Sequence, residues 1–452
     1  MGFSSLATLG AVIGAPLDLI PPPLRDRPVS NITTDTRSLG ENALFVALVG
    51  ERFDGHNFVE QAIASGAIAA VVEQGKQSHL PCLPVANTLT AYQALGHWWR
   101  TQQPAKIVAI TGSVGKTTTK ELIAAALATQ GRVHKTQANY NNDIGVPKTL
   151  LQVQPDHNFA VVEMGMRGPG EIARLARTAV PDVAVITNVG TAHIGRLGSE
   201  QAIANAKCEL LAELPISGIA VLNYDNARLM STANRVWAGR TITFGLEGGD
   251  VQGHLLDSET LVVQGIRLPL PLLGRHNALN LLAAIAVMQA LNLDWRGLSA
   301  GLEVELPSGR ARRVVLPNDV VLLDETYNAG VESMTAALHL LAETPGQRRI
   351  AVLGTMKELG EQSVALHRQV GRVVSQLGLD RLLILADPEE AAALAEAASG
   401  VETVAFDNHS SVAQHLSAVL EPGDRVLLKA SRSVALDRVV DQLVTALSGS
   451  EP

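Results

Sequence analysis

The amino-acid sequence predicts an α/β protein with three domains: a small N-terminal α/β domain, a central domain with a parallel sheet and a phosphate-binding loop, and a C-terminal Rossmann-like domain. Its length of 452 residues corresponds to about three average domains. Hydrophobic residues make up 46% of the chain and aromatic residues only 3%. The cores are therefore expected to be aliphatic, as in parallel sheets covered by helices.

The N-terminal domain is expected to comprise residues 1–84. Strands at 43–48 and 69–72 are combined with a helix at 58–64, and a stretch with prolines at 79–84 ends the block.

The central domain is expected to comprise residues 85–309. Its strands are continuous apolar runs bounded by turn residues, which indicates a doubly wound parallel sheet. They lie at 107–110, 160–163, 183–187 and 219–223. The most apolar stretch, 281–293, contains Gln289 and Asn292 and is therefore predicted to be a buried helix rather than a membrane span.

The C-terminal domain is expected to comprise residues 310–452. After the turn sequence 306–309 the alternation restarts, with strands at 320–323, 350–353, 382–385 and 426–428. No Gly-x-Gly-x-x-Gly follows the first strand of either α/β block, which argues against a dehydrogenase.

Charge and cysteine content exclude several classes of protein. The net charge is −8 and no Lys/Arg cluster offsets it, so no nucleic-acid partner is expected. Cys82 and Cys208 provide neither a disulfide framework nor a metal-ligand spacing, which is typical of a reducing cytosol. The segment Met1–Ile20 is apolar but lacks the basic start of a signal peptide. We expect a cytoplasmic protein without a membrane span.

The most informative segment is the strand, Gly-rich turn and helix between Lys106 and Gln130. Glycines allow backbone N–H groups to converge on phosphate oxygens, and the following helix presents its positive N-terminus to them. Lys116 would contact the β- and γ-phosphates, and the Thr117 hydroxyl would reach Mg²⁺. One position departs from the usual motif, because Ile110 stands where a glycine is expected. The predicted loop residues are Gly112, Ser113, Val114, Gly115, Lys116, Thr117 and Thr118.

Polar residues follow the next strands of the central domain, where the ligands of α/β sheets gather. Glu163 ends the strand 160–163, so it is a candidate ligand for Mg²⁺, although a strand-end glutamate can also face solvent. His193 lies in a Gly-rich loop beyond the strand 183–187, which favours a metal or phosphate role over a structural one.

Four further positions are weaker candidates. Lys207 is expected on a helix, and the sequence alone favours a solvated lysine there. Asn277 and Asn280 are spaced i, i+3 on an otherwise apolar helix, so both amides could meet one ligand. Arg310 lies in the link between domains and Asp324 ends a strand, and neither is diagnostic alone.

Together these segments resemble the Mur ligases, the ATP-dependent amide-forming enzymes of peptidoglycan synthesis. Residues 111–117 are similar to the shortened phosphate loop of that family, which accounts for Ile110. The other positions that match the family in order are Glu163, His193, Asn277, Asn280, Arg310 and Asp324.

Within the family the chain resembles most the branch that adds D-alanyl-D-alanine. The similar segments are 33–38 and 54–58 in the N-terminal domain, 139–147 in the central domain and 354–360 in the C-terminal domain. The resemblance implies the substrates UDP-N-acetylmuramoyl-tripeptide and D-alanyl-D-alanine. It assigns the uridine nucleotide to the N-terminal domain, ATP to the central domain and the dipeptide to the C-terminal domain. We also expect a monomer, although the sequence leaves the oligomeric state open.

The resemblance further implies roles for individual residues. Thr36, Arg37, Asn141 and Asn142 would bind substrate, and residues 112–118 would bind the phosphates of ATP. Thr117, Glu163 and His193 would organise Mg²⁺. Asn280 would approach the adenine and Asp324 the ribose, and Asn277 and Arg310 would also bind ATP. The catalytic residues would be Lys116, Glu163, His193 and Lys207, and several members of the family carry a carbamylated lysine at the position of Lys207.

The implied reaction makes an amide through an acyl phosphate. Two alternatives remain at this stage: another Mur-type or folylpolyglutamate-type ligase, and a nucleotide-dependent switch that does not ligate.

Overall fold

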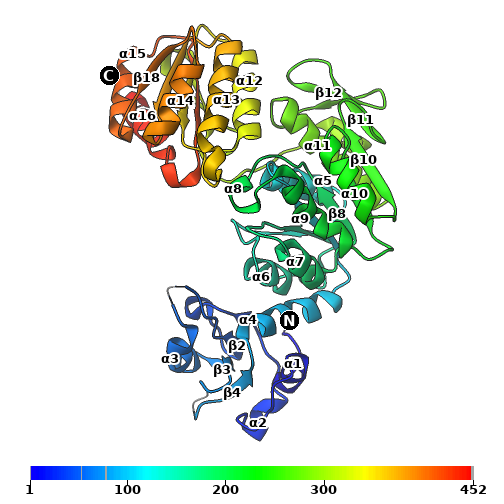
Figure 1. Ribbon diagram of the computed structural model, residues 1–452. Helices are drawn as coiled ribbons and strands as arrows, with labels where there is room; N and C mark the ends of the chain where they lie inside the picture. The colour runs from blue at the N-terminus through cyan, green and yellow to red at the C-terminus, as the bar shows by residue number, and fades with distance from the viewer. Residues whose placement is uncertain (1, 52, 77–78, 449–452) are drawn as a thin grey trace.

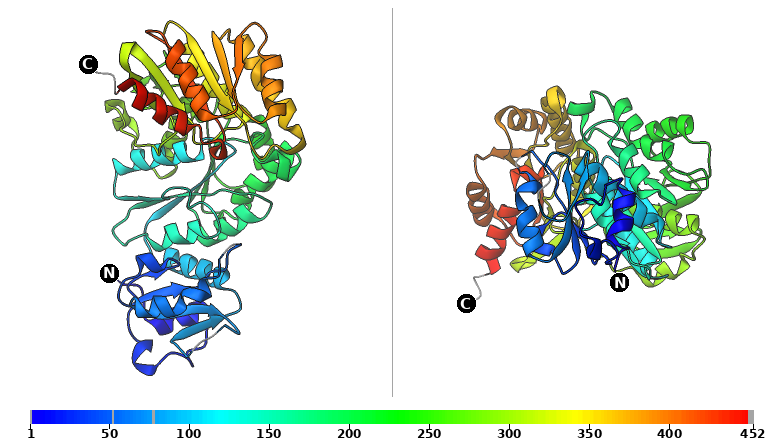
Figure 2. Two further views of the ribbon diagram at one scale, coloured as in Figure 1. Left: turned by 90° about the vertical axis from the view of Figure 1, so that its left-hand side faces the viewer. Right: turned by 90° about the horizontal axis from the view of Figure 1, so that it is seen from below.

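The computed structural model describes residues 2–51, 53–76 and 79–448. Three sheets divide these residues into three bodies that follow one another in chain order (Figures 1 and 2). The limits expected for the first domain at Met1 and for the third domain at Pro452 lie outside the described residues. None of the helices in the described ranges is both long enough and apolar enough to span a bilayer.

The N-terminal body is built on a four-stranded parallel sheet in the order β1-β2-β3-β4. Its second strand ends at Val46, two residues before the expected end, and its last strand ends at Val85. Its elements are α1 (Leu6–Val12), α2 (Pro22–Arg25), β1 (Ile32–Thr33), β2 (Ala43–Val46), α3 (Val59–Ala64), β3 (Ala67–Glu73) and β4 (Cys82–Val85).

Helix α4 (Thr88–Thr101) connects the first two bodies. It packs against α1 and β3 on the N-terminal side and against α6 (Gly145–Leu151) and α7 (Glu171–Ala179) of the central body. Asn87 caps its first turn by accepting a hydrogen bond from the backbone N–H of Thr90.

The central sheet has nine strands in the order β13-β12-β11-β10-β9-β8-β5-β7-β6. They are β5 (Lys106–Thr111), β6 (Val133–Lys135), β7 (Phe159–Glu163), β8 (Val183–Ile186), β9 (Ile219–Asn223), β10 (Thr241–Gly245), β11 (Val251–Leu255), β12 (Thr260–Val263) and β13 (Ile266–Pro269). The sheet is parallel from β6 to β11, and the pairs β11–β12 and β12–β13 add an antiparallel edge that was not predicted. A two-residue turn with positive φ at Gln264 and Gly265 closes the hairpin there.

Alternate residues of β5 point to opposite faces of this sheet. Val108 and Ile110 pack with α5 (Lys116–Ala128) and α11 (Arg275–Ala290), whereas Ile107 and Ala109 pack with α7 and α9 (Glu200–Ala212). The remaining helices of this body are α8 (Ile194–Leu197) and α10 (Ala227–Val236). Because β5 lies between β7 and β8, its carboxyl end opens into the crevice where chain order reverses, which is the usual ligand position in such sheets.

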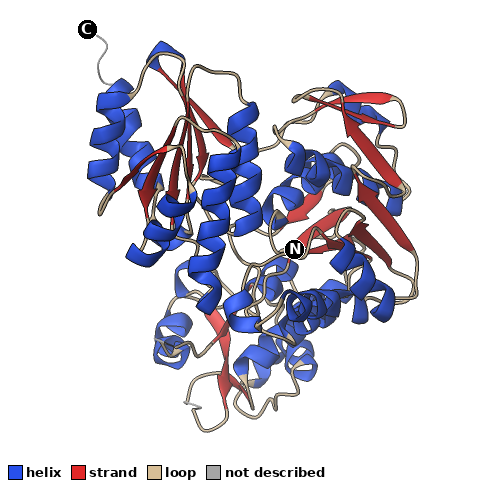
Figure 3. Cartoon of the chain, turned by 45° about the horizontal axis from the view of Figure 1, so that its top comes forward, coloured by secondary structure: helices blue, strands red, loops and turns tan. Residues whose placement is uncertain are grey.

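The C-terminal sheet has six strands in the order β14-β15-β19-β16-β17-β18, and only the edge strand β14 is antiparallel. Figure 3 shows helices on both of its faces. Its strands are β14 (Arg312–Leu316), β15 (Val320–Glu325), β16 (Arg349–Gly354), β17 (Arg381–Leu385), β18 (Glu402–Ala405) and β19 (Arg425–Lys429). Its helices are α12 (Val331–Glu343), α13 (Ser363–Gln376), α14 (Pro388–Ala397), α15 (His409–Val419) and α16 (Asp437–Ser448).

Candidate active site

The predicted phosphate loop joins the end of β5 to the beginning of α5. Gly115 has a φ of 79°, a backbone conformation that favours glycine, and a Cβ there would lie 3.1 Å from the Oδ1 atom of Asn280. A Cβ at Gly112 would overlap the hydroxyl of Thr187. Both glycines therefore allow neighbouring elements to approach the loop closely.

The loop is held from the segment that follows β8. Asn188 Oδ1 accepts a hydrogen bond from the Val114 N–H at 3.0 Å, and the Asn188 carbonyl accepts one from the Ser113 N–H at 3.1 Å. The Gly190 N–H donates to the Ser113 hydroxyl at 2.9 Å. The shape of the loop therefore depends on residues 188–190, which lie more than seventy positions away in the sequence.

Lys116 folds back onto its own loop. Its Nζ atom donates to the Gly112 carbonyl at 2.8 Å. Burial lowers the pKa of Lys116, and the charge of Arg310 lowers it further, while Glu163 acts in the opposite direction. An anion at the loop would provide this ammonium group with a charged partner in place of a carbonyl.

Glu163 is at the end of β7 and only 2% exposed, so the reading of a solvent-facing glutamate is wrong. Its Oε1 atom accepts a hydrogen bond from Asn141 Nδ2 at 2.8 Å. Its Oε2 atom is buried and has no hydrogen-bond partner among the residues that the structure describes. A buried carboxylate oxygen without a donor is a suitable ligand for Mg²⁺, which prefers oxygen.

The structure places His193 against the C-terminal body. Its φ is 69°, and its Nδ1 atom lies 2.5 Å from Glu358 Oε2. Across the described ranges, no three His, Cys, Asp or Glu side chains form a group that could hold a metal ion. The predicted magnesium set of Thr117, Glu163 and His193 therefore stays a prediction.

Lys207 is 1% exposed, so the sequence-based preference for a solvated lysine is wrong. It lies on α9 and makes no hydrogen bond or ion pair with the described residues. Burial, together with the nearby charge of Lys116, lowers the pKa of Lys207 well below its ordinary value.

Asn277 and Asn280 share one face of α11, as their spacing predicts. Asn280 Nδ2 donates to Asn277 Oδ1 at 3.1 Å, and Asn280 Oδ1 accepts from the Thr119 hydroxyl at 3.0 Å. The pair thus attaches α11 to α5 directly beside the phosphate loop.

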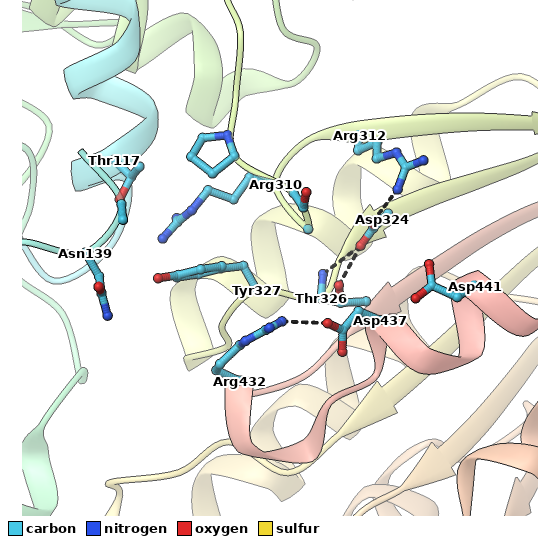
Figure 4. A pocket seen from close by; sticks show the side chains of 14 residues that line it. Thr117, Asn139, Arg310, Arg312, Asp324, Thr326, Tyr327, Arg432, Asp437 and Asp441 are labelled. Carbon is cyan, nitrogen blue, oxygen red and sulfur yellow. Dashed lines mark hydrogen bonds and ion pairs between the residues drawn. The ribbon is translucent and has the colours of Figure 1, made fainter. Parts of the chain in front are cut away.

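A cavity of about 490 Å³ separates the phosphate loop from the C-terminal body (Figure 4). Thr117 and Asn139 line it from the central body, and Arg310, Asp324 and Tyr327 line it from the other side. The Arg310 guanidinium lies 3.9 Å from the centre of the Tyr327 ring, an arrangement that favours the cation.

Asp324 is buried at the carboxyl end of β15. Its Oδ1 atom accepts hydrogen bonds from the backbone N–H and the hydroxyl of Thr326, at 3.1 and 2.7 Å. Its Oδ2 atom lies 3.9 Å from Arg312. The carboxylate is thereby fixed in the wall of the cavity.

The sequence reasoning missed Asn139, Tyr327 and Arg432 as lining residues. Tyr327 and Arg432 follow the carboxyl ends of β15 and β19. Ligands of α/β sheets gather at the carboxyl ends of the strands, and this rule, which predicted Glu163 and His193, also points to Tyr327 and Arg432 in the third body.

The predicted substrate-binding residues lie elsewhere. The Arg37 side chain is 89% exposed on the N-terminal body and pairs with Asp35 at 2.8 Å, and Thr36 precedes it in the same turn. Asn142 Oδ1 accepts hydrogen bonds from the N–H groups of Ile144 and Gly145. Asn141 hydrogen-bonds to a predicted site residue, namely Glu163.

Three family models match the chain. They describe the Mur ligase family catalytic domain at residues 28–126, the Mur ligase middle domain at 110–288 and the glutamate ligase domain of Mur ligases at 309–432.

Individual relatives match over most of their length. The UDP-N-acetylmuramoyl-tripeptide–D-alanyl-D-alanine ligase of Synechocystis sp. is 58% identical over 419 residues, which cover 92% of each chain. A crystal structure of MurF from Acinetobacter baumannii has a TM-score of 0.88 at 32% identity and covers 98% of this chain and 99% of that one. MurF ligase from Thermotoga maritima, crystallised with ADP, has a TM-score of 0.83 at 29% identity and covers 93% of this chain and 98% of that one. The chain belongs to the Mur ligase family.

Proposed function

We propose that this protein is an ATP-dependent, ADP-forming ligase that joins D-alanyl-D-alanine to UDP-N-acetylmuramoyl-tripeptide in peptidoglycan precursor synthesis. The observation that carries the proposal is the cavity between Thr117 of the phosphate loop and Arg310 of the C-terminal body. The proposal is also supported by the similarity of this chain to such a ligase over 92% of its length.

The proposed chemistry has two steps, because a carboxylate cannot react directly with an amine at neutral pH. A carboxylate oxygen of the tripeptide attacks the γ-phosphorus of ATP, and the bond to the β–γ bridging oxygen breaks, which releases ADP and gives an acyl phosphate. The dipeptide amine then attacks the acyl carbon. Phosphate leaves with the former carboxylate oxygen, and the nitrogen loses a proton.

The phosphate loop would hold the triphosphate in the first step. Residues 112–118 would offer backbone N–H groups, and Lys116 would move its ammonium group from the Gly112 carbonyl to the phosphates. Lys116 would thereby offset the repulsion between two anions, the carboxylate and the γ-phosphate, which must meet.

Glu163 is the most suitable ligand for Mg²⁺, because its Oε2 atom is buried without a donor. Thr117 and His193 complete the proposed set. When bound, Mg²⁺ would neutralise part of the phosphate charge.

The remaining nucleotide contacts are proposed from position. Asn277 and Asn280 lie beside the loop and would face the adenine, and Asp324 would accept hydrogen bonds from the ribose. Arg310 lines the cavity opposite Thr117, from where its guanidinium can reach phosphate oxygens.

The two other substrates would enter from either side of the central body. Thr36 and Arg37 of the N-terminal body, with Asn141 and Asn142 of the central body, would bind the nucleotide-linked tripeptide. The C-terminal body would bind the dipeptide. A closed arrangement protects the acyl phosphate from water, which gives a physical reason for three bodies around one reaction. We place this reaction in the cytoplasm and expect the protein to act as a monomer.

The test is ADP release with each substrate omitted in turn. A ligase of this kind releases ADP at full rate only with both the UDP-linked tripeptide and D-alanyl-D-alanine. ADP release is also measured with tripeptides ending in lysine and in diaminopimelate, and with glutamate in place of the dipeptide. These comparisons separate this ligase from a folylpolyglutamate-type or other Mur-type enzyme. Slow hydrolysis that neither substrate stimulates would instead indicate a nucleotide switch.

A further inference from the structure

Lys120 is a buried lysine that the proposed mechanism does not use. It lies one turn after Lys116 on α5 and is 1% exposed. A fully buried ammonium group is costly unless charged or polar partners compensate for the loss of water, so its partners indicate what it holds in place.

Its partners lie beneath the candidate magnesium site. Lys120 Nζ donates to the Thr136 carbonyl at 2.8 Å and pairs with Glu121 Oε1 at 2.9 Å. It also lies 4.0 Å from Glu163 Oε2, the atom without a hydrogen-bond donor. The second oxygen of Glu121 is paired at 2.5 Å with Lys135, which reaches the surface.

The segment from Thr136 to Asn141 fixes Glu163 at both ends. The Thr136 hydroxyl accepts a hydrogen bond from the Glu163 N–H at 3.0 Å, which holds the backbone. Asn141 Nδ2 donates to Glu163 Oε1 at 2.8 Å, which holds the carboxylate. Lys120 anchors the beginning of this segment to the helix of the phosphate loop through the Thr136 carbonyl.

We propose that Lys120 is a positioning residue for Glu163. It holds the segment 136–141 so that Glu163 Oε1 is occupied by Asn141 and Glu163 Oε2 remains free for a divalent cation. The proposal rests on the magnesium role of Glu163 in the proposed function. Among the described residues, the Lys120 side chain makes no hydrogen bond or ion pair with the phosphate loop, since its hydrogen bond and ion pairs go to residues 121, 136 and 163.

The test separates cation binding from nucleotide binding. Lys120→Met removes the ammonium group and keeps a chain of similar length, and Lys120→Arg keeps the charge. Lys135→Met is the matched control, because it removes a cation from the same Glu121 carboxylate on the side away from Glu163. Glu163→Gln serves as the reference for loss of the cation ligand.

Three quantities are measured for each variant. The first is the affinity of Mn²⁺ for the complex with a non-hydrolysable ATP analogue, followed by electron paramagnetic resonance. The second is the affinity for the analogue in excess chelator. The third is the thermal midpoint. We expect Lys120→Met to weaken Mn²⁺ binding by roughly 10- to 100-fold, as is usual for groups that orient metal ligands. For Lys120→Met, we expect the affinity for the analogue in chelator to change by less than about twofold. Lys120→Arg is expected to recover part of the lost Mn²⁺ affinity, and Lys135→Met is expected to bind Mn²⁺ as the wild type does.

Two outcomes would overturn the proposal. An equal loss of affinity with and without the cation would make Lys120 a nucleotide or packing residue, and unchanged or tighter Mn²⁺ binding would exclude a positioning role. If Lys120→Met does not fold, Thr136→Val tests the same route, because it removes the acceptor of the Glu163 N–H and leaves the ammonium group in place. Wild-type ADP release with both substrates is measured separately, so failure of the proposed ligase function is distinguishable.

Discussion

Thr191 of the central body donates both its backbone N–H and its hydroxyl to the carboxylate of Glu332 on the C-terminal body, at 2.6 and 3.2 Å. A Cβ at the preceding Gly190 would collide with this carboxylate. The Gly190 N–H is bonded in turn to the Ser113 hydroxyl of the phosphate loop. The position of the C-terminal body is therefore connected to the shape of the loop by one short chain of hydrogen bonds.

Replacing Glu332 is expected to loosen the C-terminal body and to weaken ATP binding. Glu332→Ala leaves a backbone donor and a hydroxyl without their charged acceptor, a loss of about 1.5–3 kcal/mol for such hydrogen bonds. We expect the radius of gyration from small-angle scattering to increase. With the full loss expressed in binding, the KM for ATP rises roughly 10- to 150-fold. Glu343→Gln, an exposed change at the end of the same helix, is the control. An unchanged KM in an expanded molecule would show that the loop keeps its shape without Glu332.

Lys116→Ala is expected to abolish ligation while the fold is kept. Within the described residues its Nζ atom hydrogen-bonds only to carbonyls of its own loop, so its removal leaves no charged partner unpaired. Loss of a charge aimed at the transferred phosphoryl group lowers rates by roughly 10³-fold or more. We expect Lys116→Ala to release no ADP when both substrates are present and to keep the thermal midpoint of the wild type. Lys106→Ala, at the exposed start of β5, is the control. Near-normal ADP release by Lys116→Ala would refute the assignment.

The contact between His193 and Glu358 predicts a dependence of stability on pH. The close contact with His193 lowers the pKa of Glu358, with further contributions from the charges of His193 and Arg196. The ionised form is thus favoured in the folded state. Its contribution to stability is complete above the ordinary value of 4.5 and is lost as the pH falls through the lower folded value. Denaturant unfolding of wild type and Glu358→Gln should show a difference that is present at pH 6 and shrinks below about pH 4.5. Glu361→Gln, a nearby exposed change, should show no such trend.

Periodicity predicted the strands that form the middle of each sheet, because buried parallel strands are continuous apolar runs. The strand Ile219–Asn223 has the predicted limits, β5 is one residue longer than predicted at each end, and β7 begins one residue earlier than predicted. The short strands from β10 to β13 were missed. In β11 (Val251–Leu255) exposed polar residues alternate with buried ones, so no apolar run marks that strand.

The sequence predicted which residues to examine at the site but not what they contact. The spacing of Asn277 and Asn280 fixed their common face, since both lie on one helix. The partner of His193, in contrast, is Glu358 in another body, and the burial of Lys207 depends on elements far away in the chain. Contacts between bodies have no local sequence signal, because they depend on how the bodies dock.

Lys207 is expected to form a carbamate. Burial and the charge of Lys116 lower the pKa of Lys207 well below its ordinary value, so a larger share of the amine is uncharged near neutral pH. The free electron pair of that amine can attack CO₂, forming a nitrogen–carbon bond with loss of a proton. The product is a carbamate anion in place of the buried amine. Because this anion would lie close to the positive charge of Lys116, its formation is electrostatically favourable. Protein equilibrated with ¹³C-bicarbonate should give a carbamate signal in ¹³C NMR that is absent from Lys207→Met, and Lys120→Met should keep it. A wild-type spectrum without that signal at saturating bicarbonate would show that Lys207 acts as an amine or not at all.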